Sequence, residues 1–250
     1  MPYSFRNHHK NIKMAKSILH KANTRGHADH GWLNSYHSFS FAGYYNPERM
    51  NFGALRVLND DTVAGGRGFS THPHDNMEII SIPLEGDLEH KDNMGTLAVI
   101  KQGDIQSMTA GTGVQHSEKN KNMDAVVKFL QIWVVPNKRN VVPKYNQITT
   151  DLDGHKNIFQ QIVSPVGENE GVQIQQNAWF NLGKFDKGIS TDYTIHSAQN
   201  GVYAFIISGS AEINGTKLEQ RDGLGIWETN TLSIKTQTED TQILLMEVPM

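Results

Sequence analysis

The sequence predicts an all-β protein built from two similar β-barrels. Helical periodicity is scarce, and the short segment Lys10–His20 is the main stretch whose residues could form a helix. Short runs of β-type residues dominate the rest of the chain and are separated by turn signals, of which Asn214-Gly215 is typical of a type I′ hairpin. Many short strands at close spacing are typical of a sandwich or a barrel.

The predicted strands are short apolar or alternating runs that end at turn residues. The turns contain the pairs Gly86-Asp87, Gly103-Asp104 and Asp222-Gly223. The strands are expected near Leu55–Leu58, Glu78–Ile82, Leu88–His90, Leu97–Lys101, Val126–Val135, Ile158–Val163, Ile174–Phe180, Val202–Ile207, Ala211–Ile213, Thr216–Leu218, Gly225–Trp227, Leu232–Lys235 and Gln242–Val248.

A faint internal duplication suggests that the two barrels are related. Residues 77–89 contain an apolar strand, a glycine turn and an alternating strand, and residues 202–215 repeat this order. The stretch 137–150 between the repeats is polar and contains a proline, which is typical of a crossing between domains. We therefore expect a flexible N-terminal extension over 1–15, a first barrel over 16–136, and a linker with a second barrel over 137–250.

Composition excludes several classes of function. The net charge of −3 argues against a strongly basic nucleic-acid binder, and no apolar run approaches the roughly 18–20 residues that span a bilayer. The absence of cysteine excludes disulfides, thiolate metal sites and a cysteine nucleophile. The N-terminus lacks the apolar core of a signal peptide, so a cytoplasmic location is expected. The twelve histidines point instead toward imidazole chemistry.

Two short motifs carry the predicted chemistry. His72-Pro73-His74 and His116-Ser117-Glu118 each place two ligand-type side chains at positions i and i+2, which share one face of a strand. Either motif alone is usually incidental. Together they would bring three imidazoles and one carboxylate to one point, a set that suits Fe(II), Mn(II), Ni(II), Co(II), Cu(II) or Zn(II) and leaves coordination positions open for chemistry. The glycine-rich turn 110–113 would bring His116 back toward the barrel axis.

Longer segments around these motifs resemble the pirin family. Gly68–Gly95 is similar to the first cupin motif of that family, and Gly103–Glu118 is similar to the second. Lys21–Leu33 and His37–Tyr45 resemble its opening segment. The likeness extends from about residue 17 to the C-terminus, weakens after residue 140, and is strongest to the shorter bacterial pirins described as quercetin 2,3-dioxygenases.

The resemblance implies a bicupin fold, in which two jelly-roll-like barrels pack together and the first holds one metal. It also implies the ligand set His72, His74, His116 and Glu118, and a dioxygenase that acts with dioxygen on a flavonol such as quercetin. Fe(II) is the favoured ion, with Ni, Co, Mn, Cu or Zn as alternatives. A small aromatic substrate is expected, without a membrane or direct nucleic-acid partner.

Two other functions remain open from the sequence. Some pirins are described as metal- and redox-dependent regulators, so this chain could instead bind a transcription factor or a metabolic enzyme. An isomerase of sugars or small acids ranks last, because no sugar-binding array can be identified.

The catalytic base is predicted to be Glu118 or Glu78. Glu78 lies four residues after His74, where many other cupins place their carboxylate ligand, whereas pirins take it from the second motif. Glu78 is therefore expected to support the ligands or to be structural. His27, His30 and His37 are expected to be structural histidines or pocket wall. An aromatic cluster is more often core than substrate platform; it comprises Trp32, Phe39, Phe41, Tyr44 and Tyr45.

Overall fold

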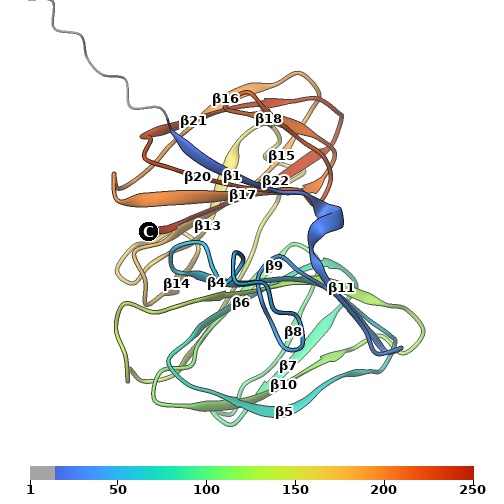
Figure 1. The fold of residues 1–250 in the computed structure, drawn as a ribbon. Coiled ribbons are helices and arrows are strands. Elements are labelled where there is room, and N and C mark those ends of the chain that lie inside the picture. The colour runs from blue at the N-terminus through green and yellow to red at the C-terminus, as the bar shows by residue number, and fades with distance from the viewer. Residues whose placement is uncertain (1–14) are drawn as a thin grey trace, which may run out of the picture.

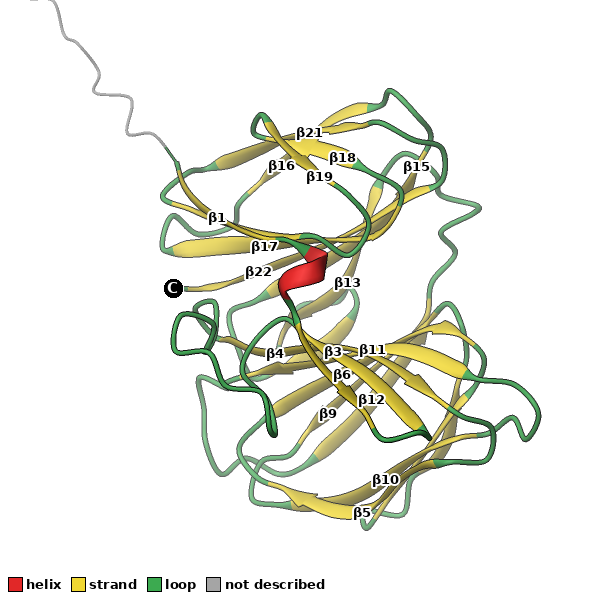
Figure 2. Ribbon diagram, turned by 45° about the vertical axis from the view of Figure 1, so that its right-hand side comes forward, coloured by secondary structure: helices red, strands yellow, loops and turns green. Residues whose placement is uncertain are grey.

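The protein folds as two β-barrels stacked on each other, which confirms the predicted all-β bicupin (Figure 1). The structure is a computed structural model in which residues 15–250 are described. In that range there are 22 strands and one short 3₁₀ helix, Ala22–Thr24, which links the barrels (Figure 2). No helix among the described residues is long and apolar enough to cross a bilayer.

The N-terminal barrel consists of a seven-stranded and a four-stranded sheet. Their strand orders are β12-β9-β6-β11-β4-β3-β2 and β5-β10-β7-β8. The strands are β2 (Gly26–Asp29), β3 (Leu33–His37), β4 (Leu55–Val63), β5 (Gly68–His74), β6 (Glu78–Glu85), β7 (Leu88–Asp92), β8 (Leu97–Ile100), β9 (Asp104–Thr109), β10 (Val114–Asn120), β11 (Val127–Val134) and β12 (Lys144–Thr149).

The C-terminal barrel has the same two-sheet construction. Its strand orders are β1-β20-β17-β22-β15-β13-β14 and β16-β21-β18-β19. The strands are β1 (Lys16–His20), β13 (Phe159–Pro165), β14 (Val172–Ile174), β15 (Trp179–Phe185), β16 (Ser190–Thr194), β17 (Asn200–Ser208), β18 (Ala211–Ile213), β19 (Thr216–Leu218), β20 (Gly223–Trp227), β21 (Thr231–Thr236) and β22 (Thr241–Pro249).

The internal duplication is visible in the strand order. Seven strands of the first barrel, β9, β6, β11, β5, β10, β7 and β8, occupy the places that β20, β17, β22, β16, β21, β18 and β19 hold in the second. In this correspondence β6 is equivalent to β17 and β7 to β18, which agrees with the duplication of residues 77–89 in residues 202–215.

The edge strands β1 and β12 each pair with the barrel other than the one that they precede in sequence. β1 precedes the first barrel in sequence but pairs along its whole length with β20 of the second, from Lys16↔Trp227 to His20↔Gly223. In Figure 1 it is the blue strand across the orange-to-red barrel. β12 precedes the second barrel and pairs with β9 of the first, so residues 144–149 are a strand of the first barrel, although we expected them in the linker to the second.

Two sequence expectations are corrected by this pairing. Residues 16–20 belong to the C-terminal barrel, although we expected them in the first. They are also a strand and not the end of a helix, because the hydrogen bonds between β1 and β20 outweigh the local helical spacing. Residues 10–14 of that expected helix, and residues 1–14 of the expected extension, lie outside the described part of the chain.

The main hydrophobic core lies between the two seven-stranded sheets. Leu130, Ile132 and Val134 of β11 point into it from one side, and Phe205, Leu244 and Met246 point into it from the other. Alternate residues of a strand face opposite sides, so Phe129, Gln131 and Trp133 of β11 face the interior of the N-terminal barrel. The strand that stabilises the domain interface thus also supplies side chains to the site described next.

Candidate metal centre

The three histidines that the sequence predicted as metal ligands meet inside the N-terminal barrel. β5 and β10 are antiparallel neighbours, and their register places His72 directly opposite His116. The ligand nitrogens of His72, His74 and His116 all lie within 4.8 Å of one another. The rings are 4.5–4.9 Å apart, centroid to centroid. The two motifs therefore converge as their i, i+2 spacing predicts.

The turn before β10 brings His116 to this position. Gly111 and Gly113 have φ angles of +49° and +136°, a region that favours glycine. A side chain at Gly111 would collide with the carbonyl oxygen of Val141. The Gly111 carbonyl also accepts the N–H of Asn76 at 2.9 Å, which ties the turn to the segment after His74.

Glu118 lies beside the three histidines but belongs to a second group. Its carboxylate forms a cluster with His116 and His90, again within 4.8 Å, so His116 is common to both groups. A β-bulge between His116 and Glu118 shifts the register of β10 against β5. Glu118 accepts hydrogen bonds from the Ser81 hydroxyl at 3.1 Å and from the Gln131 amide at 2.7 Å.

A chain of hydrogen bonds orients the ring of His116. His90 and Asp92 are both buried, and His90 Nε2 lies 2.9 Å from Asp92 Oδ2. If His90 donates Nε2–H to this carboxylate, its Nδ1 accepts the Nδ1–H of His116 at 3.4 Å. The lone pair of His116 then lies on Nε2, which is buried and has no partner among the described residues. Such outer partners fix the tautomer and orientation of metal-bound histidines.

The ionisation states fit a metal centre. Burial and neighbouring imidazoles lower the pKa of His74 to about 4 and that of His116 to about 2, so both rings are neutral at pH 7, as a metal ligand must be. His72 donates its Nδ1–H to the Ser70 carbonyl, 2.7 Å away, because a carbonyl oxygen only accepts; Nε2 is therefore the nitrogen left for a metal. Burial raises the pKa of Glu118 to about 7.

A cavity of about 830 Å³ opens beside these ligands. His72, His74 and Glu118 lie on its wall, and the ring of Trp133 packs edge-on against His74 at 5.0 Å. Most of the exposed lining is apolar, and it includes the side chains of Trp32, Leu33, Phe41, Tyr44 and Phe69. The size and lining suit a small aromatic molecule.

The residues before the first motif divide between cavity and core. His27, His30 and His37 line the cavity, in agreement with their reading as pocket wall. Trp32, Phe41 and Tyr44 also line it, so the expectation that the aromatic cluster is core holds only in part. Phe39 is buried in the interdomain core, and Tyr45 is exposed.

Glu78 does not reach this site, which corrects its assignment as a candidate base. On β6, Ser81 faces Glu118, whereas Glu78 shares the opposite face with Ile80 and Ile82 of the interdomain core. Its carboxylate accepts the hydroxyl of Thr109 at 2.6 Å and the backbone N–H of Gln175 from the second half of the chain. Glu78 is thus a buried acid at the domain interface.

The second barrel carries apolar side chains where the first has ligands. The pairs His72↔His116 and His90↔Glu118 correspond by strand register to Tyr193↔Leu232 and Ile213↔Ile234. All four of these residues belong to the hydrophobic core of the second barrel. Packing fills the space that the polar site occupies in the first.

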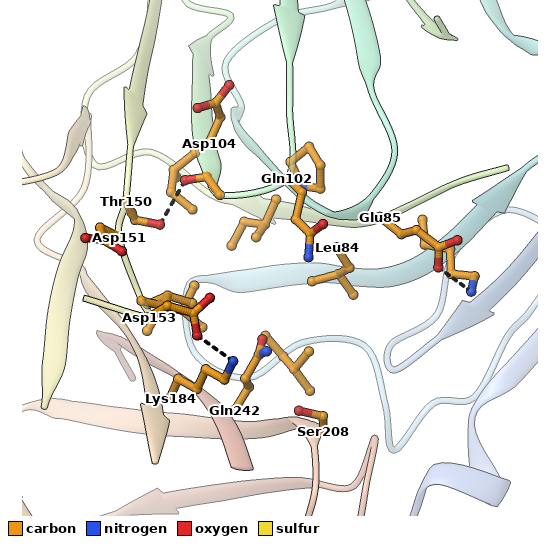
Figure 3. Close-up of a pocket in the computed structure, with 18 of the residues that line it drawn as sticks. Leu84, Glu85, Gln102, Asp104, Thr150, Asp151, Asp153, Lys184, Ser208 and Gln242 are labelled. Carbon is orange, nitrogen blue, oxygen red and sulfur yellow. Dashed lines mark hydrogen bonds and ion pairs between the residues drawn. The ribbon is translucent and has the colours of Figure 1, made fainter. Parts of the chain in front are cut away.

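Another cavity, of about 550 Å³, lies at the seam between the barrels (Figure 3). Its basic groups are already paired: Lys184 lies 2.6 Å from Asp153, and Lys128 lies 2.6 Å from Glu85. Asp104 accepts hydrogen bonds from Thr149 and Gln147. The two lysines have acidic partners and Asp104 has neutral donors, so this cavity offers weaker chemistry than the histidine site.

Sequence reasoning missed the residues that support the ligands. His90 and Asp92 form the same i, i+2 pattern as the ligand motifs, and this was the available signal. Ser81 and Gln131 carry no such pattern, because isolated polar residues in apolar strands do not show which strand they will face.

Comparisons with known proteins agree with this geometry. Residues 18–134 match the Pirin family, and residues 161–248 match the quercetinase C-terminal cupin domain. The chain is 40% identical over 231 residues to a quercetin 2,3-dioxygenase of Escherichia coli K12, covering 92% of this chain and 98% of that protein. It is 35% identical over 223 residues to a pirin-like protein of Caulobacter vibrioides, covering 89% and 95%.

A solved structure extends the likeness to three dimensions. The crystal structure of the bacterial pirin YhhW from Escherichia coli in complex with nickel(II) superposes with a TM-score of 0.88 at 38% identity. The match covers 94% of this chain and 99% of that one.

Proposed function

Because this chain belongs to the pirin family, we propose that it is a metal-dependent dioxygenase that cleaves a flavonol such as quercetin. The observation that carries the proposal is the aromatic cavity whose wall holds His72, His74 and Glu118. The relative of Escherichia coli K12 named quercetin 2,3-dioxygenase supports the substrate class.

The ligand set fits one divalent transition metal. We propose that His72, His74, His116 and Glu118 hold it, in keeping with the nickel(II) of the related pirin structure. Three neutral imidazoles and one carboxylate are typical of Fe(II), Ni(II), Co(II) and their neighbours in the series. Fe(II) is our first choice. Nε2 of buried His116 has no hydrogen-bond partner within residues 15–250, and a buried polar atom left unpaired is costly, which supports a metal ion at this position.

The bound ion would supply Lewis acidity that favours the ionised form of a substrate hydroxyl. The protein's part is to position the substrate and manage its proton. Glu118 is buried, and its pKa of about 7 suits a group that accepts a proton near neutral pH. Ser81 and Gln131 hold its carboxylate in place through their hydrogen bonds.

The aromatic walls would orient a flat substrate and exclude water. Trp133 packs against His74, so a ring lying along the indole would be directed at the ligand cluster. Trp32 and Phe69 pack edge to face at 5.4 Å and form another part of the wall. An apolar enclosure of this kind strengthens electrostatic interactions within it.

The test combines metal analysis with a turnover assay. Protein purified without chelator or affinity resin should contain one metal ion per chain by elemental analysis. Quercetin absorbance should fall with matching oxygen uptake, and the His116→Ala variant should lose both metal and turnover. Absence of turnover with every one of Fe(II), Ni(II), Co(II), Mn(II) and Cu(II) would overturn the proposal.

A metal-dependent protein-binding role is the alternative outcome. It would be favoured if the metal-loaded chain turned over no flavonol but captured a protein partner differently in its Fe(II) and Fe(III) forms.

A further inference from the structure

A second polar group lies in the wall of the cavity, apart from the metal ligands. Ser35 and His37 of β3 and Asn59 and Asp61 of β4 all line the cavity, and each is at most 3% exposed. We call these four residues the acceptor cluster. β3 and β4 are antiparallel neighbours with Ser35 directly opposite Asp61 and His37 directly opposite Asn59.

The hydrogen bonds of the cluster can be followed atom by atom. The Ser35 hydroxyl has one hydrogen and donates it to Asp61 Oδ1. Ser35 Oγ also lies 2.8 Å from His37 Nε2, so His37 must be the donor in that bond. Burial lowers the pKa of His37, so its ring is neutral and carries this single N–H. His37 Nδ1 is therefore a bare acceptor.

Two acceptors of the cluster are left without a donor. His37 Nδ1 and Asn59 Oδ1 are both buried, and neither has a hydrogen-bond partner among the described residues. Buried polar atoms are nearly always paired, because an unpaired one costs about 1–3 kcal/mol. The two residues face each other across the strand pair and line the same cavity. The missing partner is therefore a hydrogen-bond donor that enters from the cavity.

The cluster is not a hydrolytic triad. In such a relay the serine gives its proton to histidine, and the carboxylate orients the histidine. Here the serine lies between the two other groups, and its proton is already bonded to Asp61. The arrangement fixes the histidine tautomer instead of activating the hydroxyl.

We propose that the acceptor cluster is a binding subsite for a free hydroxyl group of the aromatic ligand, remote from the oxygen that faces the metal ligands. This inference rests on the proposed function and narrows its substrate class to polyhydroxylated aromatics. Asn59 lies directly opposite Gln131, which bonds Glu118, so the subsite and the metal centre are joined by one row of polar side chains across the barrel. Both groups line the same cavity, so one ligand within it can contact both.

Equilibrium binding to metal-loaded, full-length protein under anaerobic conditions tests the subsite without turnover. The probes are quercetin, its derivative methylated on every hydroxyl except the 3-hydroxyl, and unsubstituted 3-hydroxyflavone. A methoxyl group cannot donate a hydrogen bond. Measurements are made at pH 8, above the pKa of about 7 to which burial raises Asp61, so that Asp61 is an acceptor. Quercetin should bind about tenfold or more tightly than both other compounds.

Two variants remove the acceptors separately. Asn59→Leu and His37→Phe should each reduce the quercetin preference several-fold, while affinity for 3-hydroxyflavone changes little. Asn181→Leu is the matched control, because Asn181 lies opposite Leu245 in the second barrel as Asn59 lies opposite Gln131 in the first. Asn181 is also buried, but its amide bonds Tyr193 and not the cavity, so the preference should be unchanged.

The outcomes separate this inference from the proposed function. Equal binding of the three compounds, or an unchanged preference in both variants, would overturn the subsite even if quercetin is turned over. Selective binding without turnover would support the subsite and overturn the dioxygenase. Failure of all three compounds to bind would overturn both.

Discussion

Replacement of Glu78 by glutamine should change the pH dependence of stability without affecting the metal centre. Glu78 is 1% exposed, and burial raises its pKa from the ordinary 4.5 to about 7. The folded protein therefore binds this proton more tightly than the unfolded chain does. Stability from this group is fully present below pH 4.5 and is lost as the pH rises through 7.

The size of this loss follows from the pKa change. Each pKa unit corresponds to about 1.4 kcal/mol, so a rise from 4.5 to about 7 amounts to about 3 kcal/mol in total, most of it between pH 5 and pH 8. Glutamine cannot ionise. Its amide can still accept the Gln175 N–H and donate to the Thr109 hydroxyl, so the fold should be preserved.

Urea unfolding at pH 5 and at pH 8 measures the effect. The free energy of unfolding should fall from pH 5 to pH 8 in both proteins, because buried Asp61 and Glu118 also have raised pKa values and are present in both. The fall should be about 2–3 kcal/mol smaller in Glu78→Gln than in the wild type, because the variant lacks the Glu78 carboxyl. Metal content and flavonol turnover should be unchanged. Glu85→Gln is the control, since Glu85 is an exposed residue at the end of the same strand.

Two results would refute this reasoning. An identical pH dependence in variant and wild type would show that Glu78 does not hold a proton in the folded state. Loss of metal or turnover in Glu78→Gln would place Glu78 in the site, contrary to its position on the interdomain face of β6.

Four further predictions test the site and the core. His116→Ala should reduce metal content from one ion per chain to none by elemental analysis while far-UV circular dichroism stays that of the wild type; retained metal would show that the ligand set is wrong. His90→Phe should weaken metal affinity about 10- to 100-fold in a chelator competition, because His116 loses the partner that fixes its tautomer, and unchanged affinity would contradict that role. Metal affinity should fall as the pH drops below 7, because Glu118 must release its proton to bind the ion. Calorimetry at pH 6 and pH 8 measures this, and equal affinities would exclude the coupling. Leu130→Ala should lower the free energy of unfolding in urea by about 2–5 kcal/mol, because Leu130 is fully buried between the barrels, and a loss below about 1 kcal/mol would mean that the interface adjusts to the cavity.

The sequence alone predicted that the histidines of the two motifs would meet. His72 and His74, like His116 and Glu118, are two residues apart, and the pleat of a strand puts such residues on one face wherever that strand lies in the fold. The glycines at 111 and 113 indicated the turn, because their backbone angles disfavour other residues. The repeated order of strands and turns likewise predicted two related barrels.

Tertiary structure decided which face of each strand meets the site. Glu78 and Ser81 lie on opposite faces of β6, and local sequence cannot show which of them faces Glu118, because that depends on the packing of β6 between the two halves of the chain. Tertiary structure also decided three other features: the pairing of β1 with the second barrel, the contact of His90 with His116, and the unpaired acceptors of His37 and Asn59. Each depends on strands far apart in sequence that become neighbours only when the sheets assemble, and pairing at that range leaves no local periodicity to read.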